Sequence, residues 1–243
     1  MKKNIIYGLH PVMEAIKSGQ TIDKIFVQKG LRGAQSAVLV DLLQQKNISY
    51  KTVPVEKLNR LTRENHQGLV AFISPVKFVP LEEILENTSF EQPVTFVLLD
   101  GITDPRNLGA IIRTAVAVDA NGIIIPENNT APVNEETVKT SAGGIFKIPV
   151  SKVKHLKDAL FLLQSYDIKI LSASEKARKT IYDEDLKSHV GIIMGSEGKG
   201  IQKSLLQMSQ PVKLPMSAKI DSLNVSVACG IILYEIVRQR LTS

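Results

Sequence analysis

The chain has 243 residues, of which 44% are hydrophobic and 22% charged, and its formal net charge is +6. No apolar run approaches the roughly eighteen residues of a membrane span, and Gly8 and His10 come before a signal-peptide core could form. The single cysteine, Cys229, excludes an internal disulfide and a cysteine-built zinc site. We therefore expect a globular cytoplasmic protein without a metal centre and with Cys229 in its core.

Residues 1–75 alternate between helical and strand patterns, which predicts a small α/β domain. They carry 11 Lys and Arg against 5 Asp and Glu, whereas residues 76–243 carry 19 of each kind. Such an excess is typical of a polyanion-binding surface, and a solubilising face is an equally good alternative on charge alone. The expected elements are helix 11–16, strand 24–27, helix 34–46, strand 48–53, helix 54–61 and strand 68–73.

Prolines and a shift in composition over residues 76–93 predict a linker with one helical turn at 81–85. The continuous apolar run 94–100 is typical of a strand that is buried on both faces. Strands and helices alternate after it, so residues 94–243 predict a doubly wound parallel sheet. The expected elements are helix 108–118, strand 122–125, helix 135–140, strand 148–150, helix 156–165, strand 168–172, strand 190–194, helix 202–208, strand 212–214 and helix 223–240.

A glycine-rich turn, Gly195-Ser196-Glu197-Gly198-Lys199-Gly200, follows the strand expected at 190–194. Glycines let a backbone lie close to a ligand, and ligands of α/β sheets bind at the carboxyl ends of the strands. The turn fits neither a dinucleotide fingerprint nor a P-loop, and its carboxylate disfavours a bound phosphate. The alternative interpretation is a plain surface turn.

Four polar residues stand out near helix starts or inside a helix. Arg113 interrupts an apolar helix, where we expect it to be buried and to need a carboxylate or phosphate partner. The alternative is a structural arginine held by a salt bridge. Asn107 precedes the same helix, and Ser222 and Asn224 open the last one, so each of these three could be only a helix cap.

Together these segments resemble the three motifs of the SpoU/TrmH family of SPOUT RNA methyltransferases. The first motif is met at Asn107, Ala110 and Arg113-Thr114, and the third at Ser222–Ser226. The middle motif departs in spacing, because Gly195-Ser196-Glu197 is followed by glycines at 198 and 200. The resemblance covers most of residues 94–243.

The first domain shows a looser resemblance. Tyr7–Val12 and Asn65–Ala71 are similar to the RNA-binding domain that precedes this catalytic domain in the family. His66 lies in the second segment, and we expect it to contact RNA or to make a hydrogen bond at the start of its strand. The resemblance thus implies an RNA substrate-binding domain at 1–75, a linker at 76–93 and a methyltransferase domain at 94–243.

The resemblance also implies the activity and the partners. We expect a SPOUT domain with a C-terminal trefoil knot, which methylates a ribose 2′-hydroxyl with S-adenosylmethionine. The most similar layout is that of bacterial enzymes acting on a guanosine of 23S rRNA. A tRNA substrate for the same chemistry, or a non-catalytic RNA-binding role in ribosome assembly, stays open. A homodimer paired through the knotted domain and the helix 223–240 is expected, because that helix is apolar around much of its circumference.

Two sets of residues carry these expectations. Because a guanidinium stays protonated, we expect Arg113 to bind a phosphate and stabilise the developing alkoxide rather than to act as a base. The expected catalytic residues are Asn107, Arg113, Glu197, Ser222 and Asn224. The expected cofactor-binding residues are Ser172, Ala173, Met194, Gly195, Ser196, Ile201, Leu214, Met216, Ser222 and Leu223.

Overall fold

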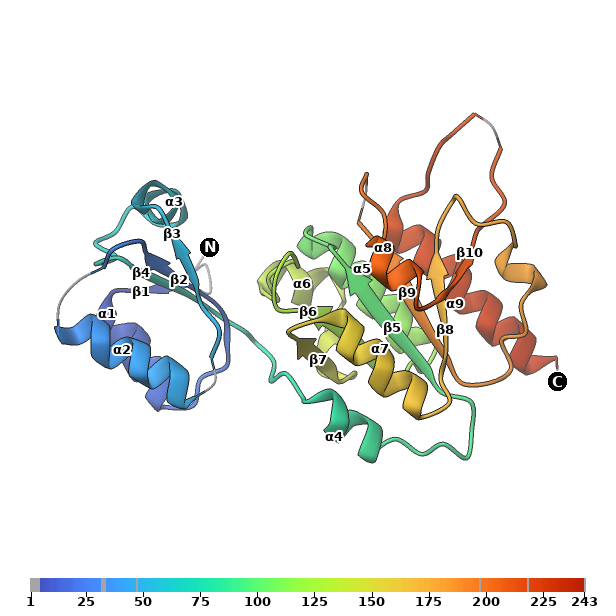
Figure 1. Ribbon diagram of the computed structural model, residues 1–243, viewed down its shortest axis with the longest axis horizontal. Coiled ribbons are helices and arrows are strands. Elements are labelled where there is room, and N and C mark those ends of the chain that lie inside the picture. Colours follow the sequence, from blue (N-terminus) through green and yellow to red (C-terminus); the bar gives the residue numbers. More distant parts are fainter. Residues whose placement is uncertain (1–4, 32–33, 47, 197, 218, 243) are drawn as a thin grey trace. The chain divides into compact units, whose positions relative to one another are not determined.

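The structure is a computed structural model that describes residues 5–31, 34–46, 48–196, 198–217 and 219–242. The chain divides into two units (Figure 1): one holds the residues up to Lys77 together with Pro132–Glu135, and the other holds Phe78–Ala131 and the chain from Glu136 onward. Within the described residues, no helix combines the length and the apolar character that crossing a membrane requires.

The first unit is a four-stranded sheet with the strand order β1-β4-β2-β3, in which only β2 and β3 run parallel. Helices α1 and α2 bury Val12, Leu39 and Leu43 in one apolar cluster, and a second cluster around Phe26 and Leu58 includes α3. This small α/β domain was predicted, apart from the three-residue strand β1. Its elements are β1 (Ile5–Tyr7), α1 (Leu9–Lys17), β2 (Ile22–Gln28), α2 (Ala34–Gln45), β3 (Lys51–Val53), α3 (Val55–Leu61) and β4 (Leu69–Ile73).

His66 makes the hydrogen bond at the start of a strand that was one of its two expected roles. Its Nδ1 accepts from the backbone N–H of Gly68 at 3.0 Å, and its Nε2 lies 2.9 Å from Oδ1 of Asn59. Because Nδ1 accepts, Nε2 carries the proton and donates to Asn59. The ring is 8% exposed, so His66 is a structural residue that fixes the entry to β4.

The second unit is a six-stranded parallel sheet with the strand order β10-β8-β9-β5-β6-β7. Every residue of the central strand β5 is buried, as its apolar run predicted. Its elements are α4 (Leu81–Glu86), β5 (Thr95–Asp100), α5 (Pro105–Ala117), β6 (Gly122–Pro126), α6 (Glu135–Thr140), η1 (Gly144–Phe146), β7 (Val150–Val153), α7 (Leu156–Ser165), β8 (Lys169–Ala173), η2 (Ile181–Asp183), β9 (Val190–Gly195), α8 (Lys203–Leu206), β10 (Gln210–Val212) and α9 (Val225–Leu241).

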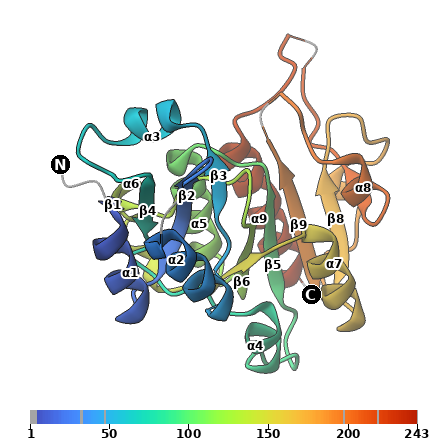
Figure 2. The ribbon, with the colours of Figure 1, turned by 60° about the vertical axis from the view of Figure 1, so that its left-hand side comes forward.

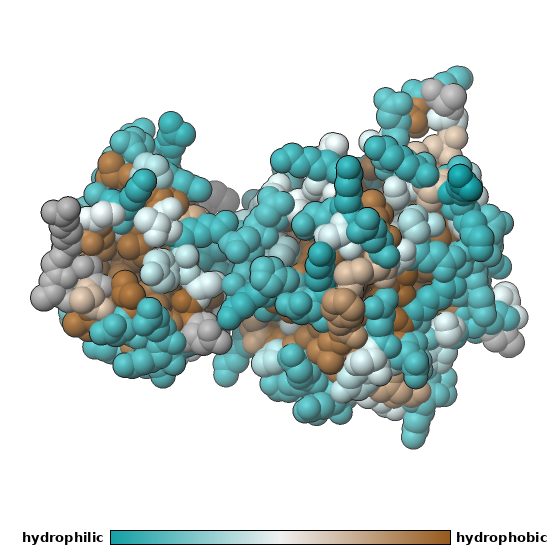
Figure 3. Space-filling view, in the orientation of Figure 1, coloured by the Kyte–Doolittle hydropathy of each residue, from teal (hydrophilic) through white to brown (hydrophobic). Residues whose placement is uncertain are grey.

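Helices cover both faces of this sheet (Figure 2). On one face, α4, α7 and α8 pack over Phe96, Leu98 and Ile193. The surface on the α7 side is mainly hydrophilic, with smaller apolar areas between polar side chains (Figure 3). On the other face α5 and α9 pack against each other. Cys229 of α9 is buried as predicted, and burial raises the pKa of its thiol to about 12.

Helix α4 lies inside the segment 76–93 that was predicted as a linker. Its single turn was expected, but Leu81, Ile84 and Leu85 are buried in the core of the second unit. The turn therefore contributes packing energy to that unit, since each buried Leu or Ile side chain stabilises a fold by about 1.5–3 kcal/mol.

The loop 174–189 runs beside the chain that leaves β10, where Thr180 and Lys213 form a parallel bridge. The N–H of Ile181 donates to the carbonyl of Lys213 at 2.9 Å, and the N–H of Lys213 donates to the carbonyl of Lys179 at 3.0 Å. The far end of the loop is tied to α9, where Gln239 accepts from the N–H of Leu186 at 3.0 Å and donates to the carbonyl of Glu184 at 3.0 Å. The loop is thus held at two places, beside the end of β10 and against α9.

Candidate functional site

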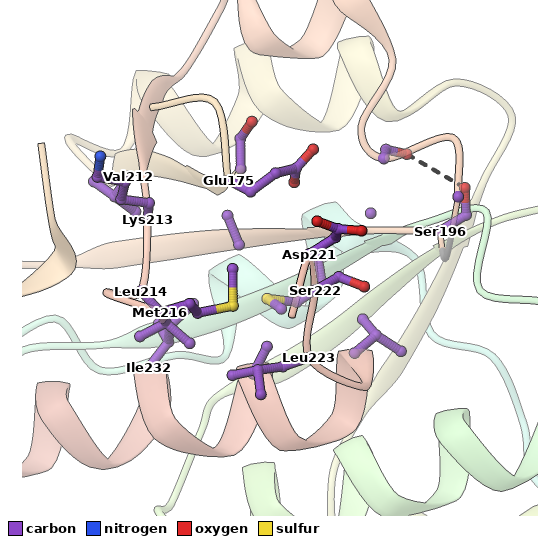
Figure 4. A pocket seen from close by; sticks show the side chains of 18 residues that line it. Glu175, Ser196, Val212, Lys213, Leu214, Met216, Asp221, Ser222, Leu223 and Ile232 are labelled. Carbon is purple, nitrogen blue, oxygen red and sulfur yellow. Dashed lines mark hydrogen bonds between the residues drawn. The ribbon is translucent and has the colours of Figure 1, made fainter. Parts of the chain in front are cut away.

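A pocket of about 330 Å³ opens in the second unit, where the carboxyl ends of β8, β9 and β10 meet the start of α9 (Figure 4). This is the edge at which α/β sheets bind ligands, and its volume suits a small organic molecule. The described residues that line it are Ala173, Ser174, Glu175, Met194, Gly195, Ser196, Gly198, Gly200, Val212, Lys213, Leu214, Met216, Asp221, Ser222, Leu223, Val225, Ala228 and Ile232.

The glycine-rich turn forms one wall of the pocket and depends on Gly195. A Cβ atom at Gly195 would lie 2.5 Å from the carbonyl carbon of Gly200 and 2.6 Å from the nitrogen of Ile201, so no side chain fits there. Ser196 and Gly200 close the turn with two backbone hydrogen bonds of 3.2 and 2.9 Å. Gly198 and Gly200 have φ angles of 87° and 66°, a region that L side chains rarely adopt.

A buried carboxylate fixes the end of this turn, and the sequence analysis did not identify it. Asp100, at the end of β5, is 3% exposed. Its two oxygens accept from the backbone N–H and from the side-chain Nε2 of Gln202, both at 2.7 Å. The signal in the sequence was an acidic residue at the end of an apolar strand. A carboxylate buried at that place needs hydrogen-bond donors, which predicts a polar partner nearby.

The structure brings eight of the ten predicted cofactor-binding residues together around the pocket, and two lie elsewhere. Ser172 is fully buried on the strand before Ala173, so their side chains lie on opposite faces of the sheet. Its hydroxyl has no hydrogen-bond partner among the described residues. Ile201 belongs to the core cluster behind the glycine turn. The eight that line the pocket are Ala173, Met194, Gly195, Ser196, Leu214, Met216, Ser222 and Leu223.

Two of the predicted catalytic residues, Asn107 and Asn224, meet although 117 positions separate them. The side-chain amide of Asn224 donates to Oδ1 of Asn107 at 3.1 Å. Asn224 is also the N-cap of α9, because its Oδ1 accepts from the backbone N–H of Ser226 at 2.9 Å and from its hydroxyl at 2.6 Å. The first turns of α5 and α9 are therefore joined directly beside Leu223, which lines the pocket.

The cap of α5 is Asp104, so the alternative interpretation of Asn107 as a cap is wrong. Asp104 accepts from the N–H of Arg106 at 2.8 Å, and Pro105 occupies the first helical position, which favours this start. The hydrogen bonds from the Arg106 side chain and backbone hold the pKa of Asp104 below its ordinary value. Asn107 lies one turn further on and is available for the contact with Asn224.

Arg113 is exposed, and the expectation that it would be buried in an apolar helix is wrong. The buried stripe of α5 runs through Leu108, Ile111, Ile112 and Ala115 at helical spacing, and Arg113 lies just beside that stripe. Its side chain makes no hydrogen bond or ion pair with another described residue. The guanidinium is therefore accessible to an anion from solvent. Glu197 lies outside the described residues.

No cluster of His, Cys, Asp and Glu among the described residues has the arrangement of a metal site. The pocket instead combines apolar side chains such as Met194 and Leu214 with backbone groups of the glycine turn. Such a lining suits an adenine ring and its ribose better than a metal or a polyphosphate.

Comparison with known proteins agrees with this geometry. Residues 94–234 match the SpoU rRNA Methylase family, and residues 5–79 match the RNA 2′-O ribose methyltransferase substrate binding family. A TrmH family tRNA/rRNA methyltransferase of Staphylococcus haemolyticus is 33% identical over 242 residues, which cover 99% of this chain and 97% of that protein. A Bacillus subtilis protein described in the same words is 32% identical and covers 97% and 95% of the two chains.

Solved structures with the same fold include cofactor complexes. The AdoMet-bound rRNA methyltransferase of Sinorhizobium meliloti is 27% identical with a TM-score of 0.61, and the match covers 96% of this chain and 86% of that one. The SpoU methyltransferase AviRb of Streptomyces viridochromogenes in complex with AdoMet is 22% identical with a TM-score of 0.64 and covers 98% and 91%.

Proposed function

Because the chain belongs to the SpoU/TrmH family of RNA methyltransferases, we propose that it methylates a ribose 2′-hydroxyl in 23S rRNA, at a guanosine. The observation that carries this proposal is the junction of the motifs. Ser222 and Leu223 line the pocket together with the glycine turn, and the next residue, Asn224, is bonded to Asn107 of the helix that bears Arg113. The pocket therefore adjoins the contact between Asn224 and Asn107, two of the predicted catalytic residues.

The cofactor of this family is S-adenosylmethionine, and the pocket fits it in size and lining. When bound, S-adenosylmethionine supplies an electrophilic methyl group on its sulfonium. In our proposal the turns around Ala173, Met194–Ser196, Leu214–Met216 and Ser222-Leu223 hold the adenosyl and methionine parts. Ser172 and Ile201 support these walls from behind rather than touching the cofactor.

The chain's own residues must then align the ribose and manage its charge. We assign Arg113 to the phosphate beside the target ribose and to the negative charge that develops on the 2′-oxygen. Its guanidinium stays protonated and acts by hydrogen bonding and charge. The hydrogen bond between Asn224 and Asn107 joins the first turns of the two helices at this point. Ser222 and Glu197 complete the proposed set.

The first unit supplies the RNA affinity in this proposal. Residues 1–75 hold the whole excess of positive charge, which suits a structured RNA. We propose residues 1–75 as the RNA substrate-binding domain and 94–243 as the methyltransferase domain, joined by the segment 76–93, whose helix α4 packs into the core of the second unit. An rRNA substrate would place the enzyme in the cytoplasm, where bacterial ribosomes assemble.

A homodimer paired through α5 and α9 is part of the proposal. Val227, Ile231 and Tyr234 of α9 are 51, 37 and 56% exposed, and they form a shallow apolar groove with Ala110 and Thr114 of α5. Contiguous exposed apolar side chains mark an interface. We expect Ile231→Glu to give a monomer in light scattering at micromolar concentration, whereas Phe161→Glu, at a more exposed apolar position on α7, should stay dimeric. A dimeric Ile231→Glu protein would refute this interface.

A trefoil knot is supported by the path of the chain around β10. The loop 174–189 pairs with Lys213 just after β10 and is bonded to Gln239 of α9, so it contacts the chain on both sides of the segment 214–224. We infer that the segment between these two contacts passes through the loop as the knot of the family's fold and that it shapes the pocket walls 173–175 and 212–216.

The experiment that tests the function compares 2′-O-methyl positions on total RNA from cells with and without this gene. We expect one guanosine position of 23S rRNA to lose its methyl group and to regain it when the purified protein and S-adenosylmethionine are added. Loss of a methyl group from a tRNA position instead would overturn the rRNA substrate but would support the same methyl-transfer reaction on tRNA. An unchanged methylation map, with no cofactor binding in a titration, would favour a non-catalytic RNA-binding role.

A further inference from the structure

The charged residues of the pocket are two carboxylates and one lysine among the described lining residues, namely Glu175, Asp221 and Lys213. In Figure 4 the side chains of Glu175 and Asp221 extend into the same part of the pocket, whereas Lys213 lies at the opposite side of the view. They come from different segments, the loop after β8 and the segment before α9. The methyl-transfer chemistry proposed above uses neither carboxylate.

Neither carboxylate is neutralised within the described part of the chain. Glu175 and Asp221 are exposed to the pocket, and neither makes an ion pair or a side-chain hydrogen bond with another described residue. Other acidic residues of the unit do have such partners, as Glu184 has in Lys169 at 2.8 Å. Two carboxylates against one lysine leave the described pocket lining with one net negative charge, which favours a cationic ligand and disfavours a phosphate-bearing nucleotide.

The substrate and product forms of the cofactor differ by one positive charge. S-adenosylmethionine carries a sulfonium, an ammonium and a carboxylate, so it is a net cation. When the sulfur–methyl bond breaks, its electron pair stays on sulfur, the methyl group bonds to the ribose oxygen and the hydroxyl proton leaves. S-adenosylhomocysteine is then a thioether without net charge, although its adenosine, ammonium and carboxylate are unchanged.

Resting on the proposed assignment of this pocket to S-adenosylmethionine, we propose that Glu175 and Asp221 select the sulfonium cofactor over its thioether product. Their charges attract S-adenosylmethionine more strongly than S-adenosylhomocysteine. The positive charge disappears during transfer, so this attraction does not accelerate the chemical step. Its effect is on cofactor exchange. S-adenosylhomocysteine has lost the attraction, so it dissociates more readily than S-adenosylmethionine and is replaced by it. Glu175 and Asp221 are specificity residues in this scheme.

Calorimetric titration of the full-length protein with each ligand tests the proposal. We expect the double variant Glu175→Gln, Asp221→Asn to bind S-adenosylmethionine about tenfold more weakly, equivalent to about 1.4 kcal/mol. Its affinity for S-adenosylhomocysteine should change by less than about twofold. Glu91→Gln removes one exposed carboxylate outside the pocket and should leave both affinities unchanged. With the natural protein, added salt should weaken only S-adenosylmethionine binding, a measurement that does not depend on the variants.

The outcomes separate this inference from the proposed function. If the double variant loses equal affinity for both ligands, the carboxylates act on the ammonium that the ligands share, and the selection of the sulfonium is overturned. Unchanged affinities for both ligands would also overturn it. Gly195→Ala is the control for the pocket, because its Cβ cannot be accommodated. If Gly195→Ala abolishes both affinities while the double variant keeps their ratio, only the charge selection fails. If Gly195→Ala alters neither affinity, the pocket is not the cofactor site.

Discussion

The two units of this protein differ in two properties: the first carries the excess positive charge, and the second contains the pocket. The first unit carries the excess positive charge on a small, mostly antiparallel sheet, and its His66 makes structural hydrogen bonds. The second unit has as many acidic as basic residues beyond position 75, yet it holds the pocket, the joined asparagines and the accessible arginine. In the proposed function, RNA affinity belongs to the first unit and methyl transfer to the second, so the two properties should be separable by experiment.

The largest expected effect is on turnover. Arg113→Ala should lower methyl transfer by on the order of 100-fold or more, because it removes a contact to the developing charge. Cofactor affinity should survive, because Arg113 does not line the pocket, and RNA affinity should survive through the first unit. Single-turnover assays with titrations of both ligands measure this. The matched control is Arg106→Ala, an exposed arginine of the same helix that pairs with Asp104. Near-normal turnover for Arg113→Ala would remove this residue from the mechanism.

RNA affinity should show the next largest effect. A fragment of residues 78–243 retains α4 with its buried Leu81, Ile84 and Leu85, so its core is complete. We expect it to bind S-adenosylmethionine normally but to bind an rRNA fragment at least about tenfold more weakly, with a flatter dependence of log affinity on log salt. Equal slopes for the fragment and the full chain would show that the second unit supplies the RNA affinity and that the positive charge of the first is a solubilising face.

A smaller effect is expected at the junction of α5 and α9. Asn224→Ala removes both the cap of α9 and the bond to Asn107, and the lost cap should cost about 1 kcal/mol of unfolding free energy. Asp104→Ala removes the cap of α5 at a comparable cost but leaves that bond in place. Denaturant unfolding and turnover, measured together, separate the roles. Equal activity of the two variants would show that Asn224 is a cap and nothing more.

The smallest effect concerns acid stability of the second unit. Burial raises the pKa of Glu184, but hydrogen bonds and charge from Lys169 and Lys179 outweigh it, so the folded pKa lies below its ordinary value. A lowered pKa adds stability above the unfolded value near 4.5 and loses it as pH falls through the folded value. Thermal unfolding should therefore show Glu184→Gln destabilised at neutral pH by about 1 kcal/mol, with the difference shrinking below about pH 4. A constant difference across this range would assign the effect to packing.

Local sequence determined the elements of both units and most of the pocket walls. The helical spacing and the apolar run of β5 are patterns among residues close together in the sequence. Gly195 is likewise required by near neighbours, because a Cβ there would clash with Gly200 and Ile201. Two of the three motif segments, the glycine-rich turn and the start of the last helix, line the pocket at the edge of the sheet that the sequence predicted. The charge asymmetry between 1–75 and the rest is likewise a property of composition.

Tertiary structure alone decided which distant groups meet and which side chains reach the pocket. Asn107 with Asn224 and Asp100 with Gln202 join residues 117 and 102 positions apart, and no local pattern encodes such pairs. One step along β8 places Ser172 behind the sheet and Ala173 in the pocket, because strand side chains alternate between faces. Arg113 is exposed because the packing of α5 on the sheet and on α9 set which stripe is buried. A sequence lists the candidate residues, whereas the packing of the strands and helices decides which of them line the pocket.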